Sequence, residues 1–334
     1  MDDHQVAYLD WPTGVVRLNA TLEDLHAALN CPDLSQLDLG RRSIIEGITH
    51  EVTHAIQIAT MGFPYLIAVE RYALLRDCVK WPVTNLNDLP QIPPSHVAEQ
   101  LEDRLVALQA PQTDGISDLA VLEGNAVYAQ FWTHYRGLNA FQLMEHLTGL
   151  PACYSSAFTL CSSLLGTRAF EAFGMLSSLA LCTRRPGAAF GLLCRETAKR
   201  KLADPRDGTY GYLEMVNDLH VAEHIELVGT AAEVLERGSG HPVYAPIVME
   251  LNDLCESDGL SVLDYFAAPF ERSAALAAAS VRPFALNSEF GEQCVWVPTN
   301  WRRDLGTKTD RNAEAEIWIL LMSLSQRMLA AVGT

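Results

Sequence analysis

Apolar residues recur every three to four positions along much of the chain, which is the periodicity of amphipathic helices. The clearest pattern runs from about Arg41 to Met61 and ends near Gly62-Phe63-Pro64. A shorter one follows Thr21, whose spacing to Asp24 resembles a capping box, and continues to about Leu29. Other helices are predicted at about 96–109, 118–136, 210–236, 246–255, 260–280 and 312–331. The small apolar residues of 152–194 predict closely packed, buried helices.

Strand-like patterns are confined to two short regions. Residues 5–18 are typical of two strands joined by a turn at Pro12-Thr13-Gly14, and Gln293-Cys294-Val295-Trp296-Val297 is a further candidate. Prolines make 81–95 an irregular connection. We therefore expect a mainly α protein with a small N-terminal β element. The whole chain, 1–334, is interpreted as one helical domain; if it divides, the boundary falls near residue 200.

Composition and charge narrow the range of partners. The chain has 334 residues with a hydrophobic fraction of 49%, as in ordinary globular proteins. Its 24 basic and 41 acidic residues give a net charge of −17, which disfavours nucleic acid and anionic membrane surfaces as partners. The polar start Met1-Asp2-Asp3-His4 is unlike a secretory signal, and the 8 scattered cysteines contain no CxxC pair. We expect a cytoplasmic protein with reduced thiols.

The sequence His50-Glu51-Val52-Thr53-His54 has the HExxH spacing of a helical metal site. Residues four apart lie on one face of an α-helix, so His50 and His54 can present ring nitrogens to one ion. Glu51 lies one position round the helix, where it can accept a proton from a metal-bound water. The pattern therefore predicts a metal site with Glu51 as the catalytic base.

The rest of this helix is consistent with a buried site. One broad apolar face is formed by Ile44, Ile45, Ile48, Val52, Ala55, Ile56 and Ala59, while Glu46, Thr49, Thr53 and Gln57 cluster on another side. Gly47 lies one turn before the histidines. We expect its missing side chain to leave room above the metal for a substrate.

A catalytic metal needs at least one more protein ligand, and Glu123 is the best candidate. On a helical projection Glu123 shares an inward face with Leu119, Ala126 and Val127. An ionised carboxylate in such surroundings is costly unless it is paired or bound to a metal. An ion pair or a helix-end carboxylate is the competing interpretation of Glu123.

His50-Glu51-x-x-His54 followed by a distant helical Glu123 resembles the arrangement of the gluzincin family of zinc metallopeptidases. The resemblance covers the motif helix and the downstream glutamate. It implies that His50, His54 and Glu123 bind zinc and that Glu51 acts as the base.

A second histidine cluster, His220-Val221-Ala222-Glu223-His224, has the inverted HxxEH order. Three interpretations stay open: core histidines with local partners, groups that complete the first site as proton donors, or a separate set of metal ligands. A zinc peptidase commonly uses His or Tyr to stabilise the oxyanion. The nominees for that role are His220, His224, Tyr128 and His134.

These residues are compatible with three functions. The leading hypothesis is metal-dependent hydrolysis of an amide or peptide bond with Zn2+. The second is a non-haem Fe2+ oxygenase that modifies a peptide or small molecule in a biosynthetic pathway, because two histidines and a carboxylate also form a facial triad. The third is a non-catalytic metal-binding module. Under the first two, the partner is a peptide or small-molecule substrate.

Overall fold

The computed structural model describes residues 6–31, 36–79, 95–134, 140–147, 149–202, 205–222, 224–257, 283–287 and 294–298. Most of these residues are helical, which confirms the prediction of a mainly α protein. The α-helices are α1 (Leu22–Leu29), α2 (Leu39–Thr60), α3 (Gly62–Val79), α4 (Ser95–Gln109), α5 (Asp118–His134), α6 (Ala140–Leu147), α7 (Ala152–Leu165), α8 (Ala169–Leu181), α9 (Pro186–Arg200), α10 (Pro205–Val221), α11 (Ala231–Glu236) and α12 (Tyr244–Ser257).

Four short strands form one antiparallel sheet. They are β1 (Ala7–Asp10), β2 (Val15–Leu18), β3 (Pro283–Asn287) and β4 (Cys294–Pro298), in the order β1-β2-β4-β3. The predicted N-terminal hairpin is confirmed, with Leu9 opposite Val16, and β4 coincides with the candidate strand at 293–297. Since β2 pairs with β4, the two ends of the described chain meet in this sheet, and β1 forms its edge.

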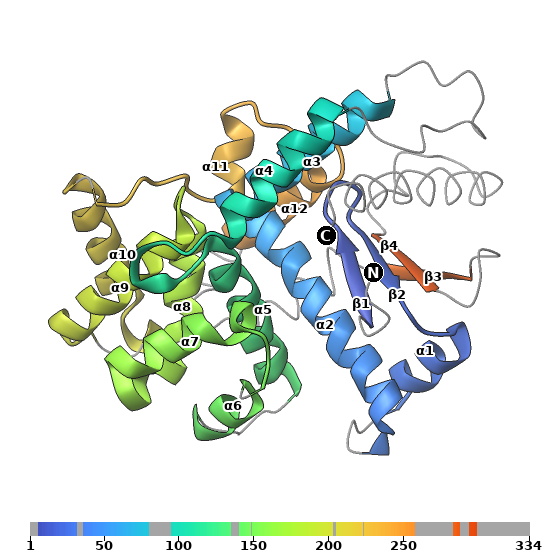
Figure 1. Cartoon of the computed structure of the whole chain (residues 1–334), viewed down its shortest axis with the longest axis horizontal. Coiled ribbons are helices and arrows are strands. Elements are labelled where there is room, and N and C mark those ends of the chain that lie inside the picture. Colours follow the sequence, from blue (N-terminus) through green and yellow to red (C-terminus); the bar gives the residue numbers. More distant parts are fainter. Residues whose placement is uncertain are drawn as a thin grey trace.

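Helix α2 runs through the middle of the molecule (Figure 1). It contacts β1 and α1 on one side and α5 on the other, while α3 and α12 also pack against it. Its start is capped by Asp38, whose side chain accepts a hydrogen bond from the Arg41 amide, as expected of an N-cap residue. Residues of α2 therefore reach both the sheet and the helical layer.

A close backbone contact marks the corner between α2 and α3. The Gly62 amide donates to the Gly229 carbonyl at 2.9 Å, and a Cβ at Gly62 would lie 2.4 Å from the same oxygen. Only glycine allows this approach. The corner fixes where α2 ends and holds it against the segment before α11.

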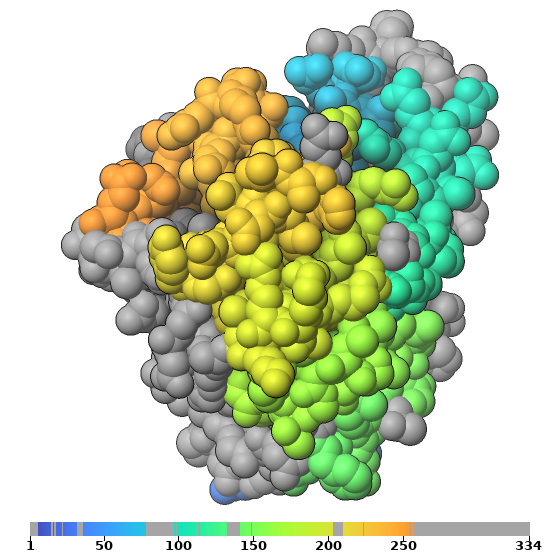
Figure 2. Space-filling view, turned by 90° about the vertical axis from the view of Figure 1, so that its left-hand side faces the viewer, coloured from blue at the N-terminus to red at the C-terminus, as the bar shows by residue number. Residues whose placement is uncertain are grey.

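The helical layer beyond α5 is built from α7, α8 and α9, which all contact α5. In α8 every residue except Glu171 is buried, so this helix is surrounded by protein. The face turned away from the sheet is covered by the later helices, coloured from green to orange (Figure 2). Helix α5 thus lies between α2 and this layer. The prediction of buried helices at 152–194 is confirmed for α8, whereas α7 buries only Ala157, Phe158, Cys161 and Leu165.

The predicted continuous helix at 210–236 is wrong. Helix α10 ends at Val221, and α11 begins only at Ala231, after a capping box formed by Thr230 and Glu233. Between them the chain makes bridges to other segments, pairing Thr183 with Leu227 and Met61 with Thr230. The predicted helices at 260–280 and 312–331 lie outside the described residues.

Candidate metal centre

The two histidines of the HExxH motif lie one turn apart on α2 and meet at their Nε2 atoms, which are 3.1 Å apart. Their rings are nearly perpendicular, with centroids 4.7 Å apart. Since two ring nitrogens at this distance repel unless a proton or a cation lies between them, the pair is arranged to share one charge. The prediction that both histidines face one point is confirmed.

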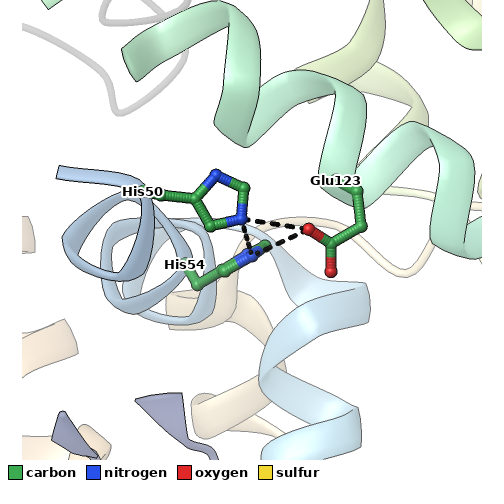
Figure 3. A group of neighbouring side chains, drawn as sticks. All are labelled: His50, His54 and Glu123. Carbon is green, nitrogen blue, oxygen red and sulfur yellow. Dashed lines mark hydrogen bonds and ion pairs between the residues drawn. The ribbon is translucent and has the colours of Figure 1, made fainter. Parts of the chain in front are cut away.

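Glu123 of α5 completes the cluster (Figure 3). Its Oε2 lies 3.1 Å from Nε2 of His50 and 3.3 Å from Nε2 of His54. These three side chains form a group that could hold a metal ion, and no other such group occurs among the described residues. Glu123 and His50 keep 17% and 12% of their side-chain surfaces exposed, so the group can be reached from solvent.

The three atoms have the spacing of metal ligands. Ligands about 2.0–2.1 Å from a tetrahedral ion lie about 3.3 Å from one another, whereas right angles between them give about 2.9 Å. The observed separations are 3.1, 3.1 and 3.3 Å. They fall between these two values, and the longest matches a tetrahedron.

The charges in the cluster reinforce one another. Burial alone would raise the pKa of Glu123, but the positive charge of His54 and hydrogen bonds from both histidines hold it well below its usual range. Burial alone would likewise lower the pKa of His54, but the Glu123 carboxylate raises it to about 9. The cluster is therefore a site built for a positive charge, carried by protons or by a metal.

Glu51 is buried and hydrogen-bonded to the sheet. Its Oε2 accepts a hydrogen bond of 2.8 Å from the backbone amide of Leu9, on the open edge of β1. Burial raises the pKa of Glu51. This increase is opposed by the charges of His54 and His50 and by the hydrogen bond from the Leu9 amide. The residue predicted as the base thus lies beside the cluster and also anchors α2 to β1.

Two aromatic rings border the histidines. The centroid of the Trp11 ring lies 5.9 Å from that of His54, and the guanidinium carbon of Arg71 lies over the Trp11 ring, 5.3 Å from its centroid. The Tyr154 ring of α7 lies 6.0 Å from that of His50. Burial raises the pKa of Tyr154, and the charge of Glu123 adds to the effect, so its hydroxyl stays protonated near these carboxylates. Neither ring lies in a recognisable motif, so the sequence did not predict their place beside the histidines.

Gln57 was expected on the side of α2 that carries Glu46, Thr49 and Thr53, but it is buried. Its Oε1 lies 2.8 Å from Nδ1 of His54, and its Nε2 donates to the Leu122 carbonyl and to Oδ1 of Asn125. Asn125 in turn donates to Ser177 and Ser178 of α8. A row of amides and hydroxyls therefore connects a metal-ligand candidate to the helical layer.

Gly47 does not leave room for a substrate, and that expectation is wrong. A Cβ at this position would lie 3.0 Å from the Cβ of Ala7 in β1. The missing side chain instead lets the sheet edge approach α2. This approach brings the Leu9 amide to Glu51.

The other nominated residues have their hydrogen bonds elsewhere. Tyr128 is buried in the core, where its hydroxyl donates to the Phe170 carbonyl. His220 lies in the last turn of α10, with Nδ1 3.0 Å from the Ile225 carbonyl, and His224 lies beyond that helix, with Nδ1 2.7 Å from the Ala222 carbonyl. Because α10 ends at Val221, the two histidines do not lie on one continuous helix. The side chain of His134 is outside the described residues.

Helix α10 packs on α8 and α9, on the side of the molecule away from α2 (Figure 1). His220 and His224 are both exposed. The structure therefore does not bring His220 and His224 to the His50 site. Their hydrogen bonds to nearby backbone carbonyls favour local partners over core burial or a second set of metal ligands.

Of the cysteines, six have side chains that the structure describes, and these are free thiols: Cys31, Cys153, Cys161, Cys182, Cys194 and Cys255. Among the described helices, none has the length and apolar character needed to cross a membrane. Comparisons with protein-family models, curated proteins and solved structures found no match. The likeness to gluzincins therefore rests on the His50, His54 and Glu123 cluster alone.

Proposed function

We propose that this protein is a metal-dependent hydrolase of the HExxH type that acts on an amide or peptide bond. The observation that carries the proposal is the convergence of two imidazole nitrogens and one carboxylate oxygen at mutual distances of 3.1–3.3 Å, with Glu51 beside them. Three protein ligands leave a coordination position for water or substrate, which is typical of catalytic rather than structural zinc.

His50, His54 and Glu123 would hold the ion. When bound, Zn2+ polarises a carbonyl group and lowers the pKa of a bound water to about 7. Glu51 would serve as the base. Because the Leu9 amide donates to its Oε2, Oε1 would be the atom that takes the proton. Burial of Glu51 favours the protonated carboxyl that results.

Tyr154 takes the place of Tyr128 as the group that stabilises the oxyanion. Its ring borders His50, and its hydroxyl remains a donor because burial and the nearby Glu123 charge raise its pKa. A hydroxyl donor at this place would stabilise the negative charge that develops on the carbonyl oxygen. The substrate is a peptide or a small amide.

The test is hydrolysis of a defined peptide mixture in water enriched in oxygen-18, with the zinc-loaded full chain. We expect new carboxyl termini that carry the heavy oxygen. Glu51→Gln should retain zinc but not turnover, because the amide can still accept from Leu9 but cannot take a proton. Equal turnover by this variant, or no cleavage by the zinc-loaded wild type, would contradict the proposal.

A second candidate is a non-haem iron oxygenase, which the Leu9 contact favours. In an oxygenase Glu51 would not act as a base. Its hydrogen bond to the Leu9 amide would then have only the structural role of anchoring α2 to the sheet. The separations of 3.1 Å also suit the right angles of a facial triad nearly as well as a tetrahedron. Metal analysis of protein purified without oxygen distinguishes the two candidates. Bound iron together with oxygen-dependent turnover would support the oxygenase and contradict the hydrolase.

A further inference from the structure

Gln57 is a buried amide that joins His54 to the helix that carries Glu123. It lies on α2 three residues after His54, and 1% of its surface is exposed. Its side chain contacts Nδ1 of His54 on one side and residues of α5 on the other. Every polar atom of this amide is therefore engaged close to the metal centre.

The orientation of the amide is fixed by a partner that can only accept. Nε2 of Gln57 donates to the backbone carbonyl of Leu122 at 3.1 Å, so Oε1 must be the atom that faces His54. An amide oxygen accepts only, so Nδ1 of His54 is the donor. The neutral ring consequently carries its lone pair at Nε2, the atom that faces Glu123 and His50.

The same amide holds the helix that carries Glu123. Its two donor bonds reach the Leu122 carbonyl and Oδ1 of Asn125, which lie immediately before and two residues after Glu123. Asn125 is oriented independently, because Ser177 donates to the Phe173 carbonyl and so accepts from Nδ2 of Asn125 at 2.8 Å. Donation in this network runs in one direction, from His54 through Gln57 and Asn125 to Ser177 of α8.

We propose that Gln57 is a positioning residue of the metal centre, which sets the tautomer of His54 and aligns α5 so that Glu123 reaches the ion. The inference rests on the proposed metal site. A hydrogen bond to the outer nitrogen of a ligating histidine orients the ring and raises its basicity, and loss of such a bond weakens metal affinity about 10- to 100-fold.

Two substitutions separate the two roles. Gln57→Leu removes every hydrogen bond of the side chain. Gln57→Glu keeps an acceptor for His54 but loses both donors to α5. The matched control is Thr60→Val, which removes a buried hydroxyl bonded to the Ile56 carbonyl on the same helix, without a contact to the ligands. All variants are made in the full chain.

The first measurement is the Kd for Zn2+ by competition with a chromophoric chelator. We expect Gln57→Leu to weaken binding about 10- to 100-fold, Gln57→Glu to weaken it less, and Thr60→Val to leave it unchanged. His54→Ala and Glu123→Ala report on the metal site itself. If these two bind zinc as wild type does, the proposed function fails; if they weaken binding but Gln57→Leu matches Thr60→Val, the Gln57 inference alone fails.

The second measurement is a proton–nitrogen NMR spectrum of the histidine rings in the zinc-bound protein. In wild type we expect His54 to show a slowly exchanging Nδ1 proton and a zinc-bound Nε2, with assignment by loss of the signal in His54→Ala. The slow Nδ1 signal should persist in Gln57→Glu and vanish in Gln57→Leu. If Gln57→Leu does not fold, Gln57→Glu decides: wild-type zinc affinity in that variant overturns the alignment of α5 by Gln57.

Discussion

The backbone amide of Leu9 and the carboxylate of Glu51 form a 2.8 Å hydrogen bond that joins the edge of the sheet to the HExxH helix. The Leu9 side chain is buried, and Glu51 is 7% exposed, so water cannot easily replace either partner. An unpaired buried amide costs about 1–3 kcal/mol. The contact therefore contributes to folding independently of any role in catalysis.

This bond predicts different stabilities for two substitutions of Glu51. Glu51→Ala should lower the free energy of unfolding by about 1–3 kcal/mol, because the Leu9 amide loses its acceptor. Glu51→Gln keeps an acceptor and should stay close to wild type. Urea unfolding of the metal-free proteins measures both. Equal stability of Glu51→Ala and Glu51→Gln would show that the hydrogen bond does not stabilise the fold.

The His54–Glu123 ion pair predicts how stability of the metal-free protein depends on pH. The pKa of Glu123 lies below its ordinary value of 4.5, so its contribution is present above that pH and lost as pH falls further. The pKa of His54 is raised from 6.5 to about 9, so its contribution is complete below 6.5 and lost as pH rises through 9. The unfolding free energy of wild type minus that of Glu123→Gln should therefore be larger at pH 6 than at pH 9.5. A difference that stays constant would exclude the ion pair.

Zinc binding should show the opposite trend with pH. The metal takes the Nε2 lone pair, so the proton that His54 holds below about pH 9 must leave first. We expect the Kd for zinc, measured by chelator competition, to tighten as pH rises from 6 to 8. Affinity independent of pH over this range would argue against His54 as a ligand.

Tyr154→Phe should reduce kcat about 100- to 1000-fold with little change in the Kd for zinc, because only the oxyanion donor is lost. Tyr128→Phe is the matched control. It removes a buried hydroxyl bonded to the Phe170 carbonyl and should lower stability while leaving kcat of the folded enzyme unchanged. If Tyr128→Phe lowered kcat and Tyr154→Phe did not, Tyr128 and not Tyr154 would be the oxyanion donor.

The corner at Gly62 predicts a steric effect. In Gly62→Ala the new Cβ would lie 2.4 Å from the Gly229 carbonyl oxygen, so one of the two segments must move. We expect a loss of about 1–3 kcal/mol in the free energy of unfolding. Gly240→Ala, where nothing lies within 4 Å of the added atom, serves as the control and should be close to neutral. Identical unfolding curves would contradict the close packing at this corner.

The sequence predicted those features that depend on local spacing. The four-residue interval of His50 and His54 follows from helix geometry, and the burial cost of a carboxylate identified Glu123 on a distant helix. The hairpin at β1 and β2 and the start of α1 also follow from local patterns. Local spacing did not show where the helix predicted at 210–236 ends, because the chain leaves it to form a bridge between Leu227 and Thr183, which is a tertiary contact.

Long-range packing determined what the sequence did not predict. Gly47 is explained by the approach of Ala7, a residue 40 positions earlier in the chain. Gln57 looked like part of a polar side because its partners, Leu122 and Asn125, lie on another helix. Trp11 and Tyr154 reach the histidines from β1–β2 and α7, so their positions depend on how these elements pack around α2.

The central claim is that His50, His54 and Glu123 together bind one metal ion. A crystal structure of the zinc-loaded protein with data at the zinc absorption edge tests it most directly. We predict one anomalous peak per chain, about 2.0–2.1 Å from Nε2 of each histidine and from a carboxylate oxygen of Glu123. A zinc-loaded crystal with no peak at these atoms, or with its peak on other residues, would contradict the account.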